Sequence, residues 1–132
     1  AKTKILGGGY YSMRPLDIDD LNKAILHCCT QQLAGASLHE LVGPEPVSYR
    51  QLIQRTAKLM GKSVEIGSVP IWLAKLLAAI TSRIKAGGMT PTVIEVITTD
   101  EVVASNADKA LGITLTPLLI TLKKILEHKK NT

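Results

Sequence analysis

The chain has 132 residues, enough for one domain with a single core but too few for a nucleotide-binding domain and a substrate domain together. Its apolar share of 45% and charged share of 20% are ordinary for a globular protein, but aromatics make up only 3% and Phe is absent, so the core must be aliphatic. The net charge of +5 arises in the middle third, where residues 46–90 carry seven bases against one acid. Such a segment suits phosphate, an anionic membrane or an acidic partner, although a solvated helix face is the simpler interpretation.

Cysteine usage and the first residues bear on the setting of the protein. Cys28 and Cys29 are adjacent, without the spacing of metal ligands or of a redox pair, and a short secreted scaffold would normally carry more cysteines. We therefore expect a reducing, cytoplasmic location. No Met precedes Ala1 and the first residues resemble neither a signal peptide nor a transit peptide, so we expect a chain cut from a longer protein.

The first third predicts one helix between short extended segments. A short apolar run at 4–6 is broken by three glycines at 7–9, and Pro15 favours extended backbone before it. Asp17 or Asp19 can cap a helix that reaches about residue 32. Its apolar positions have helical spacing: Leu21, Ala24, Ile25 and Cys28. A short strand is predicted at 38–42, followed by a Gly-Pro loop at 43–46.

Start and stop signals predict the remaining elements. Ser48 with Gln51 fits a capping box for a helix that Gly61 ends, and 63–69 reads as a strand. The predicted helices that follow cover 71–83, 90–100 and the stretch after Thr116-Pro117, with a helical turn at 107–111 and a hinge at Gly87-Gly88. The 71–83 helix is apolar nearly all round, so it must be buried in this chain or against another. The sum is a mixed, helix-rich α/β fold of five or six helices and two or three short strands.

The residues predict no catalytic, cofactor or metal site. The triple glycine lacks the G-x-G-x-x-G spacing and opens no helix, no P-loop occurs, and the three histidines and the cysteine pair are scattered. No nucleophile elbow is present either. Asp17, Asp19 and Asp20 could form an acid cluster, but helix capping and the helix dipole explain them more simply.

Two kinds of surface partner can be weighed from the sequence. The basic side of the 48–60 helix has no aromatic platform beside Arg55 and Lys58, so we expect no nucleic-acid partner. The apolar run at 69–80, with Trp72 and Lys75, could lie on a membrane surface but is too short to span one. A core or domain-interface helix is the preferred interpretation.

Several segments, in the same order, resemble extended and atypical short-chain dehydrogenase/reductases, the superfamily of sugar-nucleotide epimerases and dehydratases. The segments are MRPLDIDDLNKAI at 13–25, LHELVGPEPVSYRQL at 38–52, the Gly-Lys turn at 61–64, VPIWLA at 69–74 and LGI at 111–113. The branch that includes complex I accessory-subunit-like proteins is especially similar. The resemblance covers nearly the whole chain, and it is specific for the family rather than for a reaction.

The resemblance implies that residues 1–132 form a single C-terminal substrate-side domain of a Rossmann-type enzyme. The N-terminal Rossmann domain, with its glycine fingerprint and Tyr-x-x-x-Lys pair, would not be part of this chain. That domain would be the partner of this chain in the parent protein, and it would bind NAD(P). The residues four after Tyr10, Tyr11 and Tyr49 are not lysines. The chain would then be noncatalytic alone, with an epimerase, dehydratase or reductase as the parent; the alternative is a module that docks on a protein complex or membrane surface.

The same resemblance suggests where the substrate, a nucleotide sugar or another small molecule, would bind. In sugar-nucleotide members an arginine that resembles Arg14 points at the substrate diphosphate. Arg14 is therefore the first candidate for a ligand contact, and an ordinary salt bridge to Asp17 or Asp20 is the alternative. Tyr10 and Tyr11 would border the same cleft.

Overall fold

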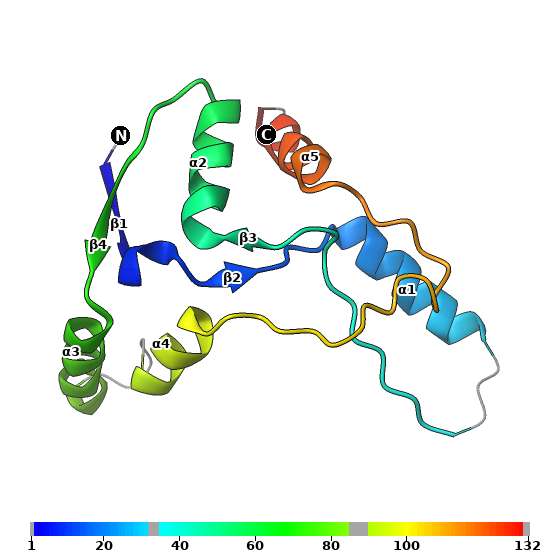
Figure 1. Cartoon of the computed structure of the whole chain (residues 1–132), viewed down its shortest axis with the longest axis horizontal. Helices are drawn as coiled ribbons and strands as arrows, with labels where there is room; N and C mark the ends of the chain where they lie inside the picture. The colour runs from blue at the N-terminus through cyan, green and yellow to red at the C-terminus, as the bar shows by residue number, and fades with distance from the viewer. Residues whose placement is uncertain (1, 32–34, 85–89, 131–132) are drawn as a thin grey trace. The chain divides into compact units, whose positions relative to one another are not determined.

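The computed structural model describes residues 2–31, 35–84 and 90–130, which contain five α-helices and four short strands (Figure 1). These residues group into two compact units, each built from two separate stretches of chain: 1–13 with 48–101, and 14–47 with 102–132. The mixed, helix-rich α/β class predicted from the sequence is confirmed. The prediction of a single substrate-side domain stays a prediction.

A two-stranded parallel sheet is the centre of the unit formed by 1–13 and 48–101. β1 (Lys2–Leu6) pairs with β4 (Glu65–Val69) in a register that places Lys2 opposite Glu65 and Leu6 opposite Val69. An exposed ion pair of 3.2 Å joins the first of these pairs. Parallel strands need a long connection, and α2 (Tyr49–Leu59) lies within it.

The predicted limits of α2 are confirmed. The hydroxyl of Ser48 accepts from the Gln51 backbone N–H at 3.1 Å, and the Gln51 side chain accepts from the Ser48 N–H at 3.0 Å. Gly61 follows the helix with φ +66°, the left-handed conformation that ends helices. The sequence alone determines this helix because its capping contacts are three residues apart.

The triple glycine forms a tight 3-10 turn, η1 (Gly7–Gly9), directly after β1. All three residues have positive φ, and a Cβ on Gly9 would overlap the Ile5 side chain and lie 3.1 Å from the backbone nitrogen of Arg50. Glycine is therefore required here because α2 begins against this turn. The break after residue 6 is confirmed, and its role in the structure is close packing.

Two further helices complete this unit. α3 (Ile71–Ile84) packs on α4 (Pro91–Thr98), and an ion pair of 3.5 Å joins Lys75 to Glu95. The predicted start of α4 is confirmed, since the Thr90 hydroxyl accepts from the Val93 N–H at 3.2 Å and Pro91 is the first helical residue. The predicted hinge at 87–88 lies outside the described residues.

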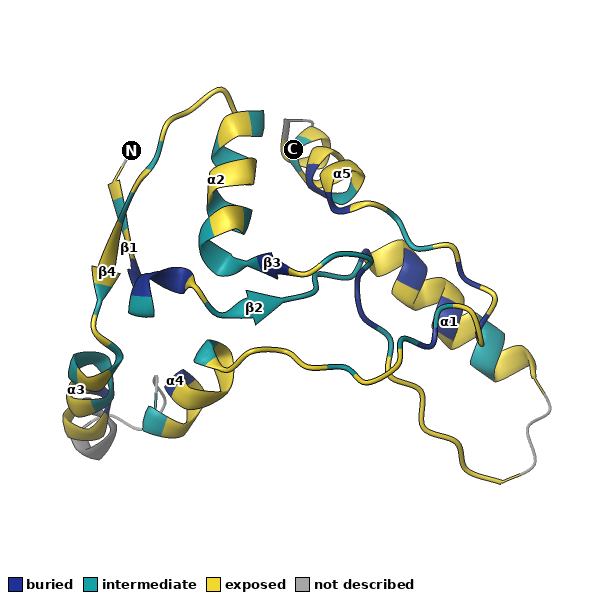
Figure 2. Ribbon diagram, viewed as in Figure 1, coloured by how far each residue is buried: buried dark blue, intermediate teal, exposed yellow. Residues whose placement is uncertain are grey.

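The other unit packs α1 (Ile18–Thr30) against the segment that leads to α5 (Leu118–Lys130). Its core is small and aliphatic, as the composition requires: Ala24, Ala107, Leu111 and Ile113. Cys28 is half-buried and packs against this core. The predicted helical turn at 107–111 is present as a turn closed by Gly112, whose φ is +63°. Figure 2 shows a few buried and intermediate positions on α1 among exposed positions that cover most of the helix.

The strand predicted at 38–42 is wrong. This segment is irregular, and its backbone groups bond to an opposite loop. The Asn106 side chain accepts from the Val42 N–H at 3.2 Å and donates to the Val42 carbonyl at 3.0 Å, while the Ala107 N–H donates to the Glu40 carbonyl at 2.9 Å. An asparagine amide, 64 residues further along the chain, thus replaces part of a strand ladder. The remaining short strands, β2 (Ser12–Met13) and β3 (Val47–Ser48), form a second two-stranded sheet.

Candidate functional site

Arg14, the first candidate for a ligand contact, fastens the start of its unit to the Gly-Pro loop. Its Nε donates to the Gly43 carbonyl at 3.0 Å and its Nη2 donates to the Pro44 carbonyl at 3.2 Å. The Gly43 N–H donates back to the Arg14 carbonyl at 3.1 Å. A Cβ on Gly43 would overlap the Pro15 carbonyl, so only glycine permits this approach. The guanidinium thus holds the loop in place, and its role toward a ligand stays a prediction.

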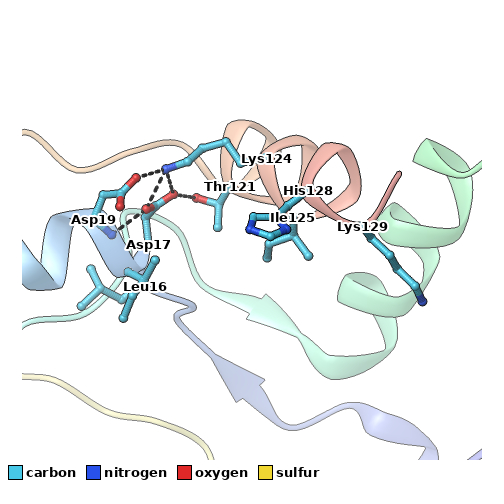
Figure 3. Close-up of a pocket in the computed structure, with 9 residues that line it drawn as sticks. Leu16, Asp17, Asp19, Thr121, Lys124, Ile125, His128 and Lys129 are labelled. Carbon is cyan, nitrogen blue, oxygen red and sulfur yellow. Dashed lines mark hydrogen bonds and ion pairs between the residues drawn. The ribbon is translucent and has the colours of Figure 1, made fainter. Parts of the chain in front are cut away.

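Asp17 is the N-cap of α1 and also joins this helix to α5. Its carboxylate accepts from the Asp19 N–H at 2.9 Å, from the Thr121 hydroxyl at 2.7 Å and from the Lys124 ammonium at 3.0 Å (Figure 3). Burial alone would raise the pKa of this carboxyl, but the bonds from Thr121, Asp19 and Lys124 together outweigh it and hold the pKa below the ordinary value. Lys124 also contacts the Asp19 carboxylate, and these hydrogen bonds raise the pKa of its ammonium group.

Asp20 is fully buried and joins α1, at a second point, to the segment that leads to α5. Its carboxylate accepts from the Thr116 backbone N–H at 2.6 Å and from the Thr116 hydroxyl at 3.0 Å, and Lys23 lies 3.4 Å away. Capping was therefore the right explanation for Asp17, but not a complete one. The two buried acids bond to residues about a hundred positions away, which no local pattern indicates. With their oxygens occupied in this way, they serve packing rather than acid–base chemistry.

A cavity of about 560 Å³ lies beside this charged cluster, under α5 (Figure 3). Leu16, Ile18 and Ile125 give it apolar walls, and His128 and Lys129 stand along the same helix. The Lys124 charge at its edge is balanced by two carboxylates. The cavity therefore suits an apolar group more than an ion.

The two candidate tyrosines lie in the other unit, and each has an aromatic or cationic neighbour. Tyr10 is 71% exposed and its ring lies under the Arg50 guanidinium, 5.4 Å from the ring centre. Tyr11 is stacked on Tyr49 with ring centres 5.8 Å apart and planes 15° apart. Burial, and then the neighbouring Tyr49, raise the pKa of the Tyr11 hydroxyl. Arg14 belongs to the unit of 14–47 and 102–132, and the cleft that it would share with the two tyrosines stays a prediction.

Arg50 is an organising residue that the sequence did not single out. Its two terminal nitrogens donate to the carbonyls of Gly8 at 3.3 Å and Ile66 at 3.4 Å. The residue thereby connects the start of α2 with the glycine turn and with β4. Its position directly after a capping serine is the only local signal, and that signal predicts a helix rather than these contacts.

The apolar helix α3 presents an open surface. Trp72 is 69% exposed, and Leu76, Leu77 and Ile80 are each about half exposed, whereas Ala78 is buried (Figure 2). Among the described residues of its unit, α3 packs one side on α4, while Trp72, Leu76 and Ile80 stay exposed. No helix among the described residues is long and apolar enough to cross a membrane. Within the same residues, no three His, Cys, Asp or Glu side chains gather as a metal site would require.

No family model matches the sequence, and no curated protein matches it. Solved structures do match this chain. The triphenylmethane reductase of Citrobacter sp. shares the fold with a TM-score of 0.66 at 21% identity, over 94% of this chain and 44% of the reductase chain. The same reductase complexed with NADP(H) gives 0.62 at 22% identity, over 92% and 44%. The chain thus has the fold of part of an NADP(H)-binding reductase and spans less than half of that protein's length.

Proposed function

We propose that this chain is the C-terminal, substrate-side part of an NAD(P)-dependent reductase or epimerase/dehydratase-like protein of the cytoplasm, and that it does not catalyse alone. The observation that carries the proposal is the fold likeness, which covers nearly all of this chain but 44% of an NADP(H)-binding reductase. In this account an N-terminal Rossmann domain holds the dinucleotide. The sequence segments that resemble the complex I accessory-subunit-like branch favour that branch.

The sheet of the first unit supports the same conclusion. Parallel sheets occur almost only where several strands are covered on both faces, and a two-stranded sheet is marginal in water. Among the described residues, β1 and β4 pair only with each other. A sheet of this kind is expected as the edge of a larger parallel sheet, which the Rossmann domain would supply.

The proposed substrate contacts are Arg14, Tyr10 and Tyr11, and the proposed substrate is a nucleotide sugar or another small molecule. The guanidinium of Arg14 binds two loop carbonyls, and its positive charge and planar fork of N–H donors are the features by which arginine recognises phosphate. Tyr10 is open to solvent, and Tyr11 stands beside it in the chain.

A nicotinamide-oxidation assay tests whether the chain is noncatalytic. The purified chain, supplied with NADPH or NADH and a panel of nucleoside-diphosphate sugars and aldehydes, should give no turnover above the protein-free rate. Saturable turnover by the chain alone would overturn the proposal, since it would mean that this part carries its own catalytic constellation.

A second candidate function rests on the exposed face of α3. Trp72, Leu76 and Ile80 are exposed on successive turns of the helix, the spacing that lays an apolar stripe on a partner or a membrane surface. In this alternative the chain is an interaction module derived from the same family. Co-sedimentation with vesicles that contain phosphatidylserine separates the candidates. Binding that falls with salt would favour the module, and no binding would count against a membrane role.

A further inference from the structure

A hollow of about 390 Å³ lies at the carboxyl end of β1, within the unit formed by 1–13 and 48–101. Ile5 and Leu6, the last two residues of the strand, form part of its wall, and Met13 and Ile97 add further apolar surface. Its volume falls in the usual range for small-molecule sites. In open parallel sheets, ligands bind beyond the carboxyl ends of the strands, which is the position of this hollow.

Two aromatic rings, those of Tyr11 and Tyr49, line the hollow. Their near-parallel stacking holds the two rings in one orientation. The backbone behind them is fixed, because the Tyr49 N–H donates to the Tyr11 carbonyl at 3.3 Å. The next residue is also fixed: the Ser12 N–H donates to the Asp100 carboxylate at 2.7 Å, and the Ser12 carbonyl accepts from the Glu101 N–H at 3.0 Å. A wall that is already ordered loses little conformational entropy when a ligand binds.

The polar groups of the hollow are few. Among the described residues, Lys4 is the one charged side chain that lines it, and it is exposed. The Tyr11 hydroxyl, whose pKa is raised by burial and then by Tyr49, stays protonated at neutral pH and can donate a hydrogen bond. Aliphatic walls, a stacked aromatic pair and one cation favour a flat, apolar ring with a negative substituent over a polar sugar.

We propose that this hollow binds the planar aromatic ring of an anionic small molecule, with the ring against Tyr11 and Tyr49 and the anionic group near Lys4. The inference deepens the proposed function and rests on it, since it assigns a ligand class to the substrate side. The ring can be that of a free aromatic acid or the base of a nucleotide. The aliphatic walls favour the aromatic acid.

Amide-resolved NMR titration of the full chain tests the proposal with three probes: naphthalene-2-sulfonate, cyclohexanesulfonate and uridine 5′-monophosphate. We expect saturable shifts at Leu6, Tyr11, Tyr49 and Ile97 with the naphthalene compound. The cyclohexane compound should bind about three- to tenfold more weakly, because it keeps the charge but has no planar aromatic ring to stack. The same shifts with the uridine compound would support the site and identify a nucleotide as the ring's source. Equal affinity for the two sulfonates, or shifts elsewhere only, would overturn the proposal.

Matched variants distinguish ligand binding in the hollow from non-specific binding to exposed aromatic side chains. Tyr11→Ala should weaken naphthalene-2-sulfonate binding about tenfold, whereas Tyr11→Phe, which keeps the ring, should bind within about twofold of wild type. Trp72→Ala removes an exposed aromatic outside the hollow and should leave the affinity unchanged. Should Tyr11→Ala fail to fold, Lys4→Gln replaces it. Its binding should be about two- to fivefold weaker than that of wild type, and this difference should grow at low salt, where the Lys4 charge is less screened. Loss of binding in Trp72→Ala but not in the Tyr11 and Lys4 variants would refute the site. None of these outcomes depends on dinucleotide binding or turnover, so the two proposals fail separately.

Discussion

Replacing Asp17 by alanine should destabilise the unit formed by 14–47 and 102–132 far more than the same change at Asp19, two residues away. Both carboxylates contact Lys124, but the Asp17 side chain is buried and that of Asp19 is 57% exposed. Asp17 also caps α1 and accepts from Thr121. The pair of variants therefore separates a buried, multiply bonded acid from an exposed ion pair.

The magnitude follows from the bonds that each change removes. Loss of an N-cap costs about 1 kcal/mol, and loss of each charge-assisted bond costs about 1.5 kcal/mol at the lower end of the usual range. The cap and the bonds to Thr121 and Lys124 give about 2–4 kcal/mol for Asp17→Ala, since such terms are not strictly additive. Asp17→Asn keeps the cap and loses the charge, so about 1–2 kcal/mol is expected. Asp19→Ala should cost about 0.5 kcal/mol.

Urea unfolding followed by circular dichroism measures these differences. With an m-value of about 1.5 kcal/mol/M, a loss of 3 kcal/mol moves the midpoint by about 2 M. If Asp17→Ala proves too unstable to fold, the comparison of Asp17→Asn with Asp19→Ala remains. Equal midpoints for the Asp17 and Asp19 variants would refute the reasoning, because the buried network would then contribute no more than a surface pair.

Three further predictions concern acid, a glycine and the candidate arginine. The folded pKa of Asp17 lies below its unfolded value, so its contribution is complete above about pH 4 and is lost as the pH falls through the folded pKa; the difference in unfolding free energy between wild type and Asp17→Asn should shrink on acidification. Gly43→Ala should cost more than about 2 kcal/mol in urea unfolding because its Cβ would overlap Pro15, whereas Gly67→Ala, with ordinary contacts around its Cβ, should cost about 1 kcal/mol or less. Arg14→Ala should weaken diphosphate-ligand binding in the full protein without unfolding it, and Arg14→Lys should restore the charge but not the two carbonyl bonds; wild-type affinity in Arg14→Ala would show that the site is misassigned.

Elements set by short-range signals could be predicted from the sequence. α2 lies where Ser48, Gln51 and Gly61 place it, and α4 begins at Thr90-Pro91, because caps and stops act within a few residues. The failed strand at 38–42 shows the limit of this reasoning. A short segment that ends in two apolar residues before a Gly-Pro loop resembles a strand, but its hydrogen-bond partner is Asn106, which no local pattern can indicate.

The candidate site, like the fold, could be predicted from the sequence only in part. The aspartates at 17 and 20 could be read as helix-capping residues, but their bonds to Lys124 and Thr116 are set by tertiary packing. Arg14 could be singled out by resemblance, whereas its hydrogen bonds to the carbonyls of residues 43 and 44 depend on the close approach that Gly43 allows. The hollow at the end of β1 combines residues from four separate stretches of chain, so only the folded unit reveals it.

The most direct test of the account is isothermal titration of the purified chain with NADPH, NADP, NADH and NAD. We expect no measurable heat of binding with any of the four, because the proposed function assigns the dinucleotide site to a Rossmann domain outside this chain. Saturable, stoichiometric binding of any dinucleotide would contradict it, and the glycine turn at residues 7–9 would then be the first place to look for the site.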